Sequence, residues 1–203
     1  MQIRELSIPD SYEITPLQRS DDRGVFLEWY RFDKLEEVAG HALNLRQGNT
    51  SVSKKGVVRG IHFADIPPGQ AKYVTCHRGA VLDYVIDIRV GSPTFGQWDT
   101  VLLDTLDRKA IYLGEGLGHA FVALTEDATV SYLVTDTYNA SREHGINPLD
   151  EQIGLVFPPD AGEALLSPKD LEAPSLAQAA ARGLLPTWDD TRAFYRSLAM
   201  DGK

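Results

Sequence analysis

The fold is decided by one stretch of the chain, Val81-Leu82-Asp83-Tyr84-Val85-Ile86-Asp87-Ile88-Arg89-Val90. Its even-numbered positions are apolar and share one face. Its odd-numbered positions combine valines with two aspartates and an arginine. Such alternation with a period of two is typical of a β-strand. The stretch therefore predicts a strand with one fully apolar face and one mixed face.

Similar short stretches follow one another up to about residue 135 and predict further strands. They cover residues 24–30, 43–52, 57–63, 72–77, 101–103, 110–113, 119–124 and 129–135. Turn-forming clusters such as Pro67-Pro68-Gly69 separate them. Many short strands without intervening helices predict a mainly β fold, either a sandwich or a barrel.

Helical signals are few and lie mostly near the C-terminus. A short helix is expected at residues 32–39, where Gly40 would end it. Two more are expected at 175–182 and 189–200, the first opened by Pro174 and followed by Gly183, where a C-terminal glycine is common.

Length and charge bound the class of protein. The 203 residues predict a single domain, 1–203, with a β-barrel core at about 10–160 and a helical tail at about 170–200 packed onto it. Lys and Arg number 20 against 29 Asp and Glu, a net charge of −9. This balance argues against nucleic acid or an anionic membrane as the main partner.

Targeting signals and cysteine chemistry are also limited. We find no apolar run of the length of a signal peptide or a membrane span, so we expect a cytoplasmic protein. The single cysteine, Cys76, excludes a disulfide framework and a cysteine-rich zinc site. Its apolar surroundings predict a packed thiol rather than a nucleophile.

The segment Arg59-Gly60-Ile61-His62 is a candidate for chemistry. In a regular strand, residues three apart point to opposite faces. Gly60 allows a bulge that would turn Arg59 and His62 toward one cavity. The alternative is a core histidine bonded to the backbone.

Three other residues carry open alternatives. His119 could pair with His62 at a metal, but no third ligand is evident, so no metal is expected. Lys72 is either a protective lysine on an edge strand or a cation inside the barrel beside His62. Tyr132 is either a core aromatic or a proton donor.

Taken in order, these residues resemble the dTDP-4-dehydrorhamnose 3,5-epimerase family, and the actinobacterial branch in particular. The resemblance runs from end to end. It rests on the blocks Asp22-Arg23-Gly24-Val25-Phe26-x-Glu28, Gly56–Phe63, Ala80–Arg89, Gly91–Trp98, Glu115–Phe121 and Leu166-Ser167-Pro168-Lys169-Asp170. It implies a cupin-like jelly-roll β-barrel with short C-terminal helices and an enzyme that needs no metal or other cofactor.

The resemblance also implies a catalytic set. Inverting a carbon beside a ketone needs a base on one face, a positive group at the ketone oxygen and an acid on the other face. By resemblance, His62 is the base and Asp170 orients its ring. Lys72 stabilises the enolate oxygen and Tyr132 returns the proton.

Other positions resemble the family's substrate contacts. Arg23 and Arg59 match the diphosphate contacts, Tyr138 the aromatic that stacks on thymine, and His119 a histidine that touches the sugar. The remaining contacts by resemblance are Glu28, Gln47, Asn49, Glu143 and Lys169. Asp83 either supports Lys72 or is a solvated strand residue. The family pairs its N-terminal strands across a homodimer, so residues near Phe26 are expected to complete the partner's site.

The sequence departs from the family pattern at Ala64, at Ala120 and at residues 155–158, which lack the usual Trp-Pro. None of these removes a proposed catalytic group. We expect an epimerase that inverts C3 and C5 of dTDP-4-dehydro-6-deoxy-D-glucose, yielding dTDP-4-dehydro-L-rhamnose. The alternative is a single-position epimerase of a dTDP-4-keto-deoxysugar in antibiotic sugar synthesis. A binding barrel without activity and a metal-dependent oxygenase are weaker alternatives.

Overall fold

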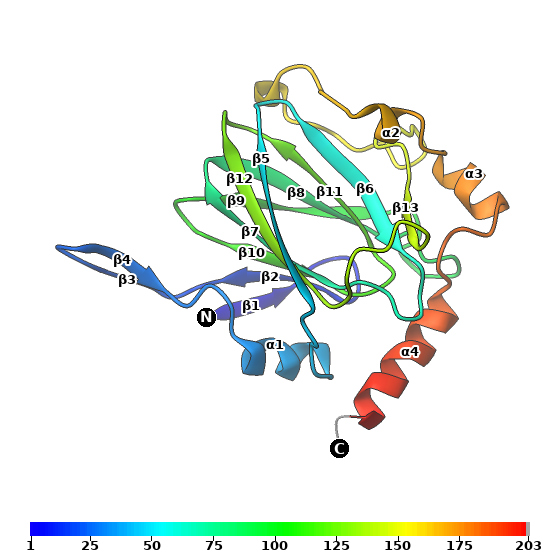
Figure 1. The fold of residues 1–203 in the computed structure, drawn as a ribbon, viewed down its shortest axis with the longest axis horizontal. Helices are drawn as coiled ribbons and strands as arrows, with labels where there is room; N and C mark the ends of the chain where they lie inside the picture. The colour runs from blue at the N-terminus through cyan, green and yellow to red at the C-terminus, as the bar shows by residue number, and fades with distance from the viewer. Residues whose placement is uncertain (202–203) are drawn as a thin grey trace.

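Two antiparallel sheets lie face to face in the computed structural model, which describes residues 1–201 (Figure 1). The six-stranded sheet has the order β1 (Gln2–Glu5), β2 (Ser11–Thr15), β10 (Ala110–Leu113), β7 (Lys72–Arg78), β12 (Ala128–Val134) and β5 (Gln47–Ser53). The five-stranded sheet has the order β13 (Glu143–Gly145), β6 (Val58–Ala64), β11 (Gly118–Ala123), β8 (Ala80–Ile86) and β9 (Trp98–Asp104). The prediction of a mainly β sandwich or barrel is confirmed.

The core between the sheets takes one apolar face from each. Val74 of β7 and Val130 of β12 meet Val85 of β8 and Phe121 of β11 there, all buried. Cys76 lies in the same cluster, where burial raises the pKa of its thiol to about 11. The prediction of a packed thiol is confirmed.

The strand that opened the sequence argument is shorter than its alternation suggests. β8 ends at Ile86, and Asp87 begins a polar turn. The Asp87 carboxylate accepts hydrogen bonds from Arg89 Nε at 2.9 Å, Ser92 Oγ at 2.6 Å and Thr94 Oγ1 at 2.6 Å. The carboxylate draws the chain into a turn because these partners lie after it in the sequence.

The helices cover the outer faces and rims of the sheets. Helix α1 (Phe32–Ala39) ends at Gly40, which has a φ of 76° as a left-handed cap requires. The short segments η1 (Pro159–Ala161) and α2 (Pro168–Leu171) precede helix α3 (Leu176–Ala181), which packs on the outer face of the five-stranded sheet. Helix α4 (Trp188–Asp201) is tied to the sheets through an ion pair of Arg192 with Asp10. No helix within residues 1–201 is long and apolar enough to cross a membrane.

Several elements were not predicted. These are β1, β2, the strand β3 (Gln18–Asp21), β13, η1 and α2. Strand β4 (Gly24–Leu27) stops three residues before the predicted end, and β5 starts at Gln47 rather than at residue 43. Strands β3 and β4 form a hairpin that projects away from the two sheets (Figure 1).

Candidate active site

A bulge in β6 brings two of the predicted residues to one face. His62 lies opposite His119 of β11, and Arg59 lies opposite Phe121, so three steps along β6 match two along β11. Gly60, with a φ of 120°, supplies the extra residue. A Cβ at this position would lie 2.4 Å from the His119 carbonyl oxygen, so only glycine fits. The predicted bulge is confirmed.

His62 pairs with a carboxylate rather than with the backbone. Its Nε2 lies 2.8 Å from Asp170 Oδ1, and Ser167 Oγ donates to Asp170 Oδ2 at 2.8 Å. Ser167 also caps the N-terminus of α2, which fixes Asp170 in the first turn. Burial acts to raise the pKa of Asp170, but the net shift lowers this pKa. The lowering comes from the hydrogen bond and charge of His62, the hydrogen bond from Ser167 and the charge of Lys169. Asp170 is therefore held as a carboxylate beside the ring.

A cavity of about 360 Å³ opens in front of this pair. Arg59, His62, Lys169 and Asp170 all line it. The Arg59 guanidinium is held in place by Ser53, because Arg59 Nε donates to Ser53 Oγ at 3.1 Å. Two cations and a histidine–carboxylate pair therefore share one cavity, which suits an anionic ligand with an acidic C–H.

Lys72 lies on a central strand, since β7 is flanked by β10 and β12. The alternative of an edge-strand lysine is therefore wrong. Loss of water around the ammonium lowers the pKa of Lys72 to about 8, while the charges of Glu143 and Asp83 partly restore it. Lys72 thus faces two carboxylates from the opposite sheet.

Asp83 is fully buried, so the alternative of a solvated strand residue is also wrong. Its two carboxylate oxygens lie 3.0 and 2.9 Å from Nε2 of His119. Burial raises the pKa of Asp83, although His119 and Lys72 act to lower it. Asp83 therefore links His119 with Lys72 inside the barrel.

Tyr132 faces the same interior from β12, where it lies opposite Asn49 of β5 and Val74 of β7. It is partly buried and packs against the core between the sheets. Burial and the charge of Glu143 raise the pKa of its phenol, and the charge of Arg59 acts to lower it. The phenol is therefore protonated at neutral pH and lies within reach of both charges.

The remaining contacts on the barrel lie near one another at the ends of β5, β12 and β13. Gln47 Nε2 donates to Asn49 Oδ1 at 2.8 Å, and Gln47 Oε1 accepts from the Tyr138 backbone N–H at 2.9 Å. The Tyr138 side chain is exposed. Glu143 pairs in register with Ala64, two residues beyond His62.

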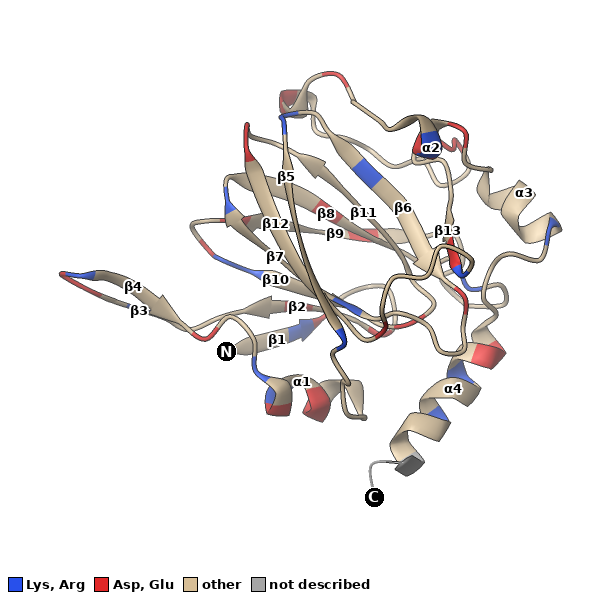
Figure 2. Cartoon of the chain, in the orientation of Figure 1, with Lys and Arg blue, Asp and Glu red and all other residues tan. Residues whose placement is uncertain are grey.

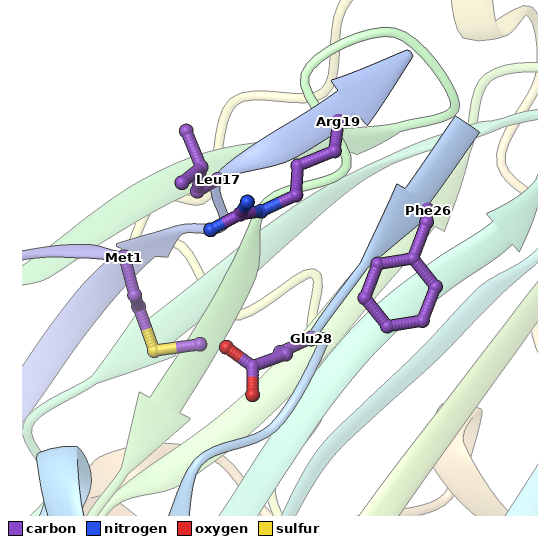
Figure 3. Close-up of a pocket in the computed structure, with 5 residues that line it drawn as sticks. All are labelled: Met1, Leu17, Arg19, Phe26 and Glu28. Carbon is purple, nitrogen blue, oxygen red and sulfur yellow. The ribbon is translucent and has the colours of Figure 1, made fainter. Parts of the chain in front are cut away.

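Arg23 and Glu28 are not brought to this cavity within one chain. Arg23 belongs to the tip of the β3–β4 hairpin, where acidic and basic residues lie side by side (Figure 2), and its side chain is 90% exposed beside Asp21. Glu28 lies near the base of the hairpin, in a separate hollow with Arg19 and Phe26 (Figure 3).

Within residues 1–201, no group of three or more His, Cys, Asp or Glu side chains is arranged to hold a metal ion. His62 and His119 are neighbours across the β6–β11 ladder. Each of them, however, directs its Nε2 to its own aspartate.

Comparison with known proteins agrees with this geometry. The family model described as dTDP-4-dehydrorhamnose 3,5-epimerase matches residues 5–178. A Mycolicibacterium smegmatis protein named dTDP-4-dehydrorhamnose 3,5-epimerase is 57% identical, over 98% of this chain and 97% of its own. The chain belongs to the dTDP-4-dehydrorhamnose 3,5-epimerase family.

Solved structures extend the similarity to the fold of this family member. An epimerase of Mycobacterium tuberculosis superposes with a TM-score of 0.95 at 49% identity, covering 98% of this chain and all of that one. A 3'-monoepimerase of Streptomyces bikiniensis, solved in complex with dTDP-quinovose, gives 0.93 at 46% identity over 96% and 98% of the two chains. The expected cupin-like fold and the classification as an enzyme are confirmed.

Sequence reasoning missed two supporting residues of the epimerase site. Ser167 fixes Asp170, and Ser53 holds Arg59. A signal for the first was present, because a serine followed by proline is typical of a helix start. Ser53 had no local signal, since its partner is on the next strand.

Proposed function

We propose that this chain inverts C3 and C5 of dTDP-4-dehydro-6-deoxy-D-glucose to form dTDP-4-dehydro-L-rhamnose. The observation that carries the proposal is the His62–Asp170 pair at the wall of a cavity that Arg59 and Lys169 also line. The base and the cations that such a substrate needs are thus present in one place. The names of the relatives support the same reaction.

In this proposal His62 removes the proton beside the C4 ketone. Asp170 keeps the ring oriented and stabilises the imidazolium that forms. Electron density moves to the ketone oxygen, where the Lys72 ammonium stabilises the enolate. Tyr132, on the facing sheet, returns a proton to the opposite side of the carbon. Exchange with solvent then removes the proton from His62 and returns one to Tyr132, and a second cycle at the other carbon completes the inversion.

The nucleotide would be held by a separate set of residues. Arg59 and Lys169 suit the diphosphate, because guanidinium forks match phosphate oxygens and lysine adds a point charge. Gln47 bonds both Asn49 and the Tyr138 backbone, and the exposed ring of Tyr138 is available for stacking on thymine. His119 would contact the sugar from β11.

Turnover in deuterated water tests the reaction and its stereochemistry. Substrate is incubated with the enzyme, and a reductase captures the inverted product for mass and NMR analysis. Deuterium at both C3 and C5 with inversion at both supports the double epimerase. Label and inversion at one carbon alone would assign the single-position alternative, which the similarity to a 3'-monoepimerase keeps in view.

We further infer a homodimer in which the hairpin completes the partner's site. The hairpin carries exposed apolar side chains, with Phe26 at 67% and Val25 at 46%, and the exposed Arg23 guanidinium, paired with Asp21, at its tip. Apolar surface of this kind is usually covered by a partner. Covering it with a second copy would deliver Arg23 to a cavity that it does not reach in its own chain.

Subunit mixing tests this arrangement. Arg23→Ala and His62→Asn chains are each expected to be nearly inactive alone. In a mixed dimer, one barrel would combine an intact His62 with an Arg23 supplied by the other chain. Random mixing should therefore restore about one quarter of wild-type activity, because about half of the dimers are mixed and each has one intact site. No recovery on mixing would place Arg23 in its own chain's site or outside it.

A further inference from the structure

Glu115 is a buried carboxylate that the proposed reaction does not use. It is only 2% exposed, and its Oε2 has no hydrogen-bond partner among the described residues. A buried, half-satisfied carboxylate costs stability, so such a group calls for a reason other than stability. The residue lies in the block Glu115-Gly116-x-Gly118-His119, which the site otherwise explains only through His119.

The other oxygen of Glu115 leads toward Lys72. Thr135 Oγ1 donates to Glu115 Oε1 at 3.1 Å and accepts from the Ala71 N–H at 2.9 Å. The Thr135 N–H in turn donates to the Ala71 carbonyl at 3.2 Å. Both backbone groups of the residue before Lys72 are thus held by one threonine, whose hydroxyl hydrogen is directed by Glu115.

Packing reinforces the same link. Gly69, with a φ of 68°, lies directly on Glu115, since a Cβ there would be 2.5 Å from the Glu115 Cβ. The turn that leads into β7 is therefore held at Gly69 by the side-chain carbons of Glu115 and at Ala71 by Thr135. From the tail, Tyr195 OH donates to the Glu115 carbonyl at 3.2 Å.

We propose that Glu115 and Thr135 are positioning residues that set the start of β7 and so aim the Lys72 ammonium at the substrate's ketone oxygen. The inference rests on the proposed role of Lys72. A displacement of about 1 Å at a reacting group can cost about 100-fold in rate, so loss of this link should be visible in kcat.

The test is a double-mutant cycle on Thr135 and Lys72, measured as deuterium uptake into substrate and as kcat and KM. Thr135→Val is expected to lower kcat about 10- to 100-fold with KM changed less than about threefold. Thr135→Ser keeps both hydrogen bonds and should restore most of the rate. Thr129→Val is the matched control: Thr129 lies on β12, which ends one residue before Thr135, and among the described residues its hydroxyl donates only to the Asp127 carbonyl.

In a Lys72→Ala background, Thr135→Val should change the residual rate less than about twofold, because the two substitutions act through one group. An equal loss in both backgrounds, or no rescue by serine, would overturn the inference. A Lys72→Ala chain with undiminished turnover would instead refute the role of Lys72 itself and remove the premise. If Thr135→Val folds poorly, the same cycle is measured with Glu115→Ala in its place, and Glu115→Gln takes the place of Thr135→Ser.

Discussion

Two histidines on neighbouring strands of the five-stranded sheet each pair with an aspartate, and the two pairs differ in exposure to water. His62 and His119 face each other across the β6–β11 ladder, and each directs Nε2 to an aspartate at 2.8 to 2.9 Å. The His62 side chain is 40% exposed, whereas that of His119 is 10% exposed. The same chemical pair therefore occurs once at a cavity wall and once in the interior.

The two carboxylates also differ in the direction of their pKa shifts, although burial alone would raise both pKa values. Both are buried, yet the pKa of Asp170 is lowered by His62, Ser167 and Lys169, while burial keeps the pKa of Asp83 raised. A firmly ionised carboxylate stabilises an imidazolium, as a base needs. Asp83 contacts the His119 ring, and its charge acts on Lys72, so it positions both side chains. The comparison supports the proposal that His62 transfers the proton and that His119 contacts the sugar.

The largest expected effect comes from breaking the exposed pair of His62 and Asp170. His62→Asn removes the base while keeping a similar volume, and kcat should fall about 1,000-fold or more, since general base catalysis contributes up to about 10⁴. Binding of dTDP, measured by calorimetry, should change little. His77→Asn, an exposed histidine on β7, is the control and should retain full turnover. Turnover within tenfold of wild type in His62→Asn would refute its role.

Changing the two carboxylates in parallel sharpens the comparison. Asp170→Asn should lower kcat about 100-fold with little change in KM, because the amide no longer stabilises the imidazolium. Asp83→Asn should lower the rate of the deprotonation step less than Asp170→Asn does. Its effect should come instead from the altered positions of Lys72 and His119. Equal losses of deuterium exchange in the two variants would show that the pairs are not functionally distinct.

Breaking the buried pair should have a smaller effect, on KM rather than on kcat. His119→Asn removes a proposed sugar contact and should raise KM about tenfold, as expected for a lost hydrogen bond to substrate, while kcat changes less than about threefold. Steady-state kinetics separates the two constants. A kcat loss as large as that of His62→Asn would make His119 part of the proton-transfer machinery.

The two pairs also show what a sequence can predict. Arg59, Gly60 and His62 are close in sequence, and their spacing was enough to predict the bulge that turns both side chains to one cavity. The partner of His62 is 108 residues away, so no local pattern could place Asp170, and only the family resemblance pointed to it. The end of β8 was missed for a different reason: the apolar alternation continues to Val90, whereas Asp87 already bonds Ser92 and Thr94 of the turn that it begins.

The hairpin marks the other limit. Local pattern suggested a strand at residues 24–30, and the resemblance suggested substrate contacts at Arg23 and Glu28. The local pattern could not show that the hairpin leaves its own barrel, because where a projecting segment packs depends on surfaces outside the chain. Only the resemblance suggested that residues near Phe26 reach a partner. Alternation along β7 likewise could not tell an edge lysine from an interior one. That distinction needs the strand order β10-β7-β12.

The smallest expected effect separates the role of Asp170 in stability from its role in catalysis. Its pKa is lower in the folded chain than the ordinary value of 3.8, so its ionised form stabilises the fold. That contribution is complete above about pH 4 and is lost as the pH falls through the folded-state pKa. At pH 7, the free energy of unfolding measured in urea should be about 1 to 2 kcal/mol higher for the wild type than for Asp170→Asn. The difference should narrow below pH 4, and the exposed Asp160→Asn should show no comparable change. A gap that stays constant or widens in acid would mean that Asp170 contributes to stability through packing rather than through its charge.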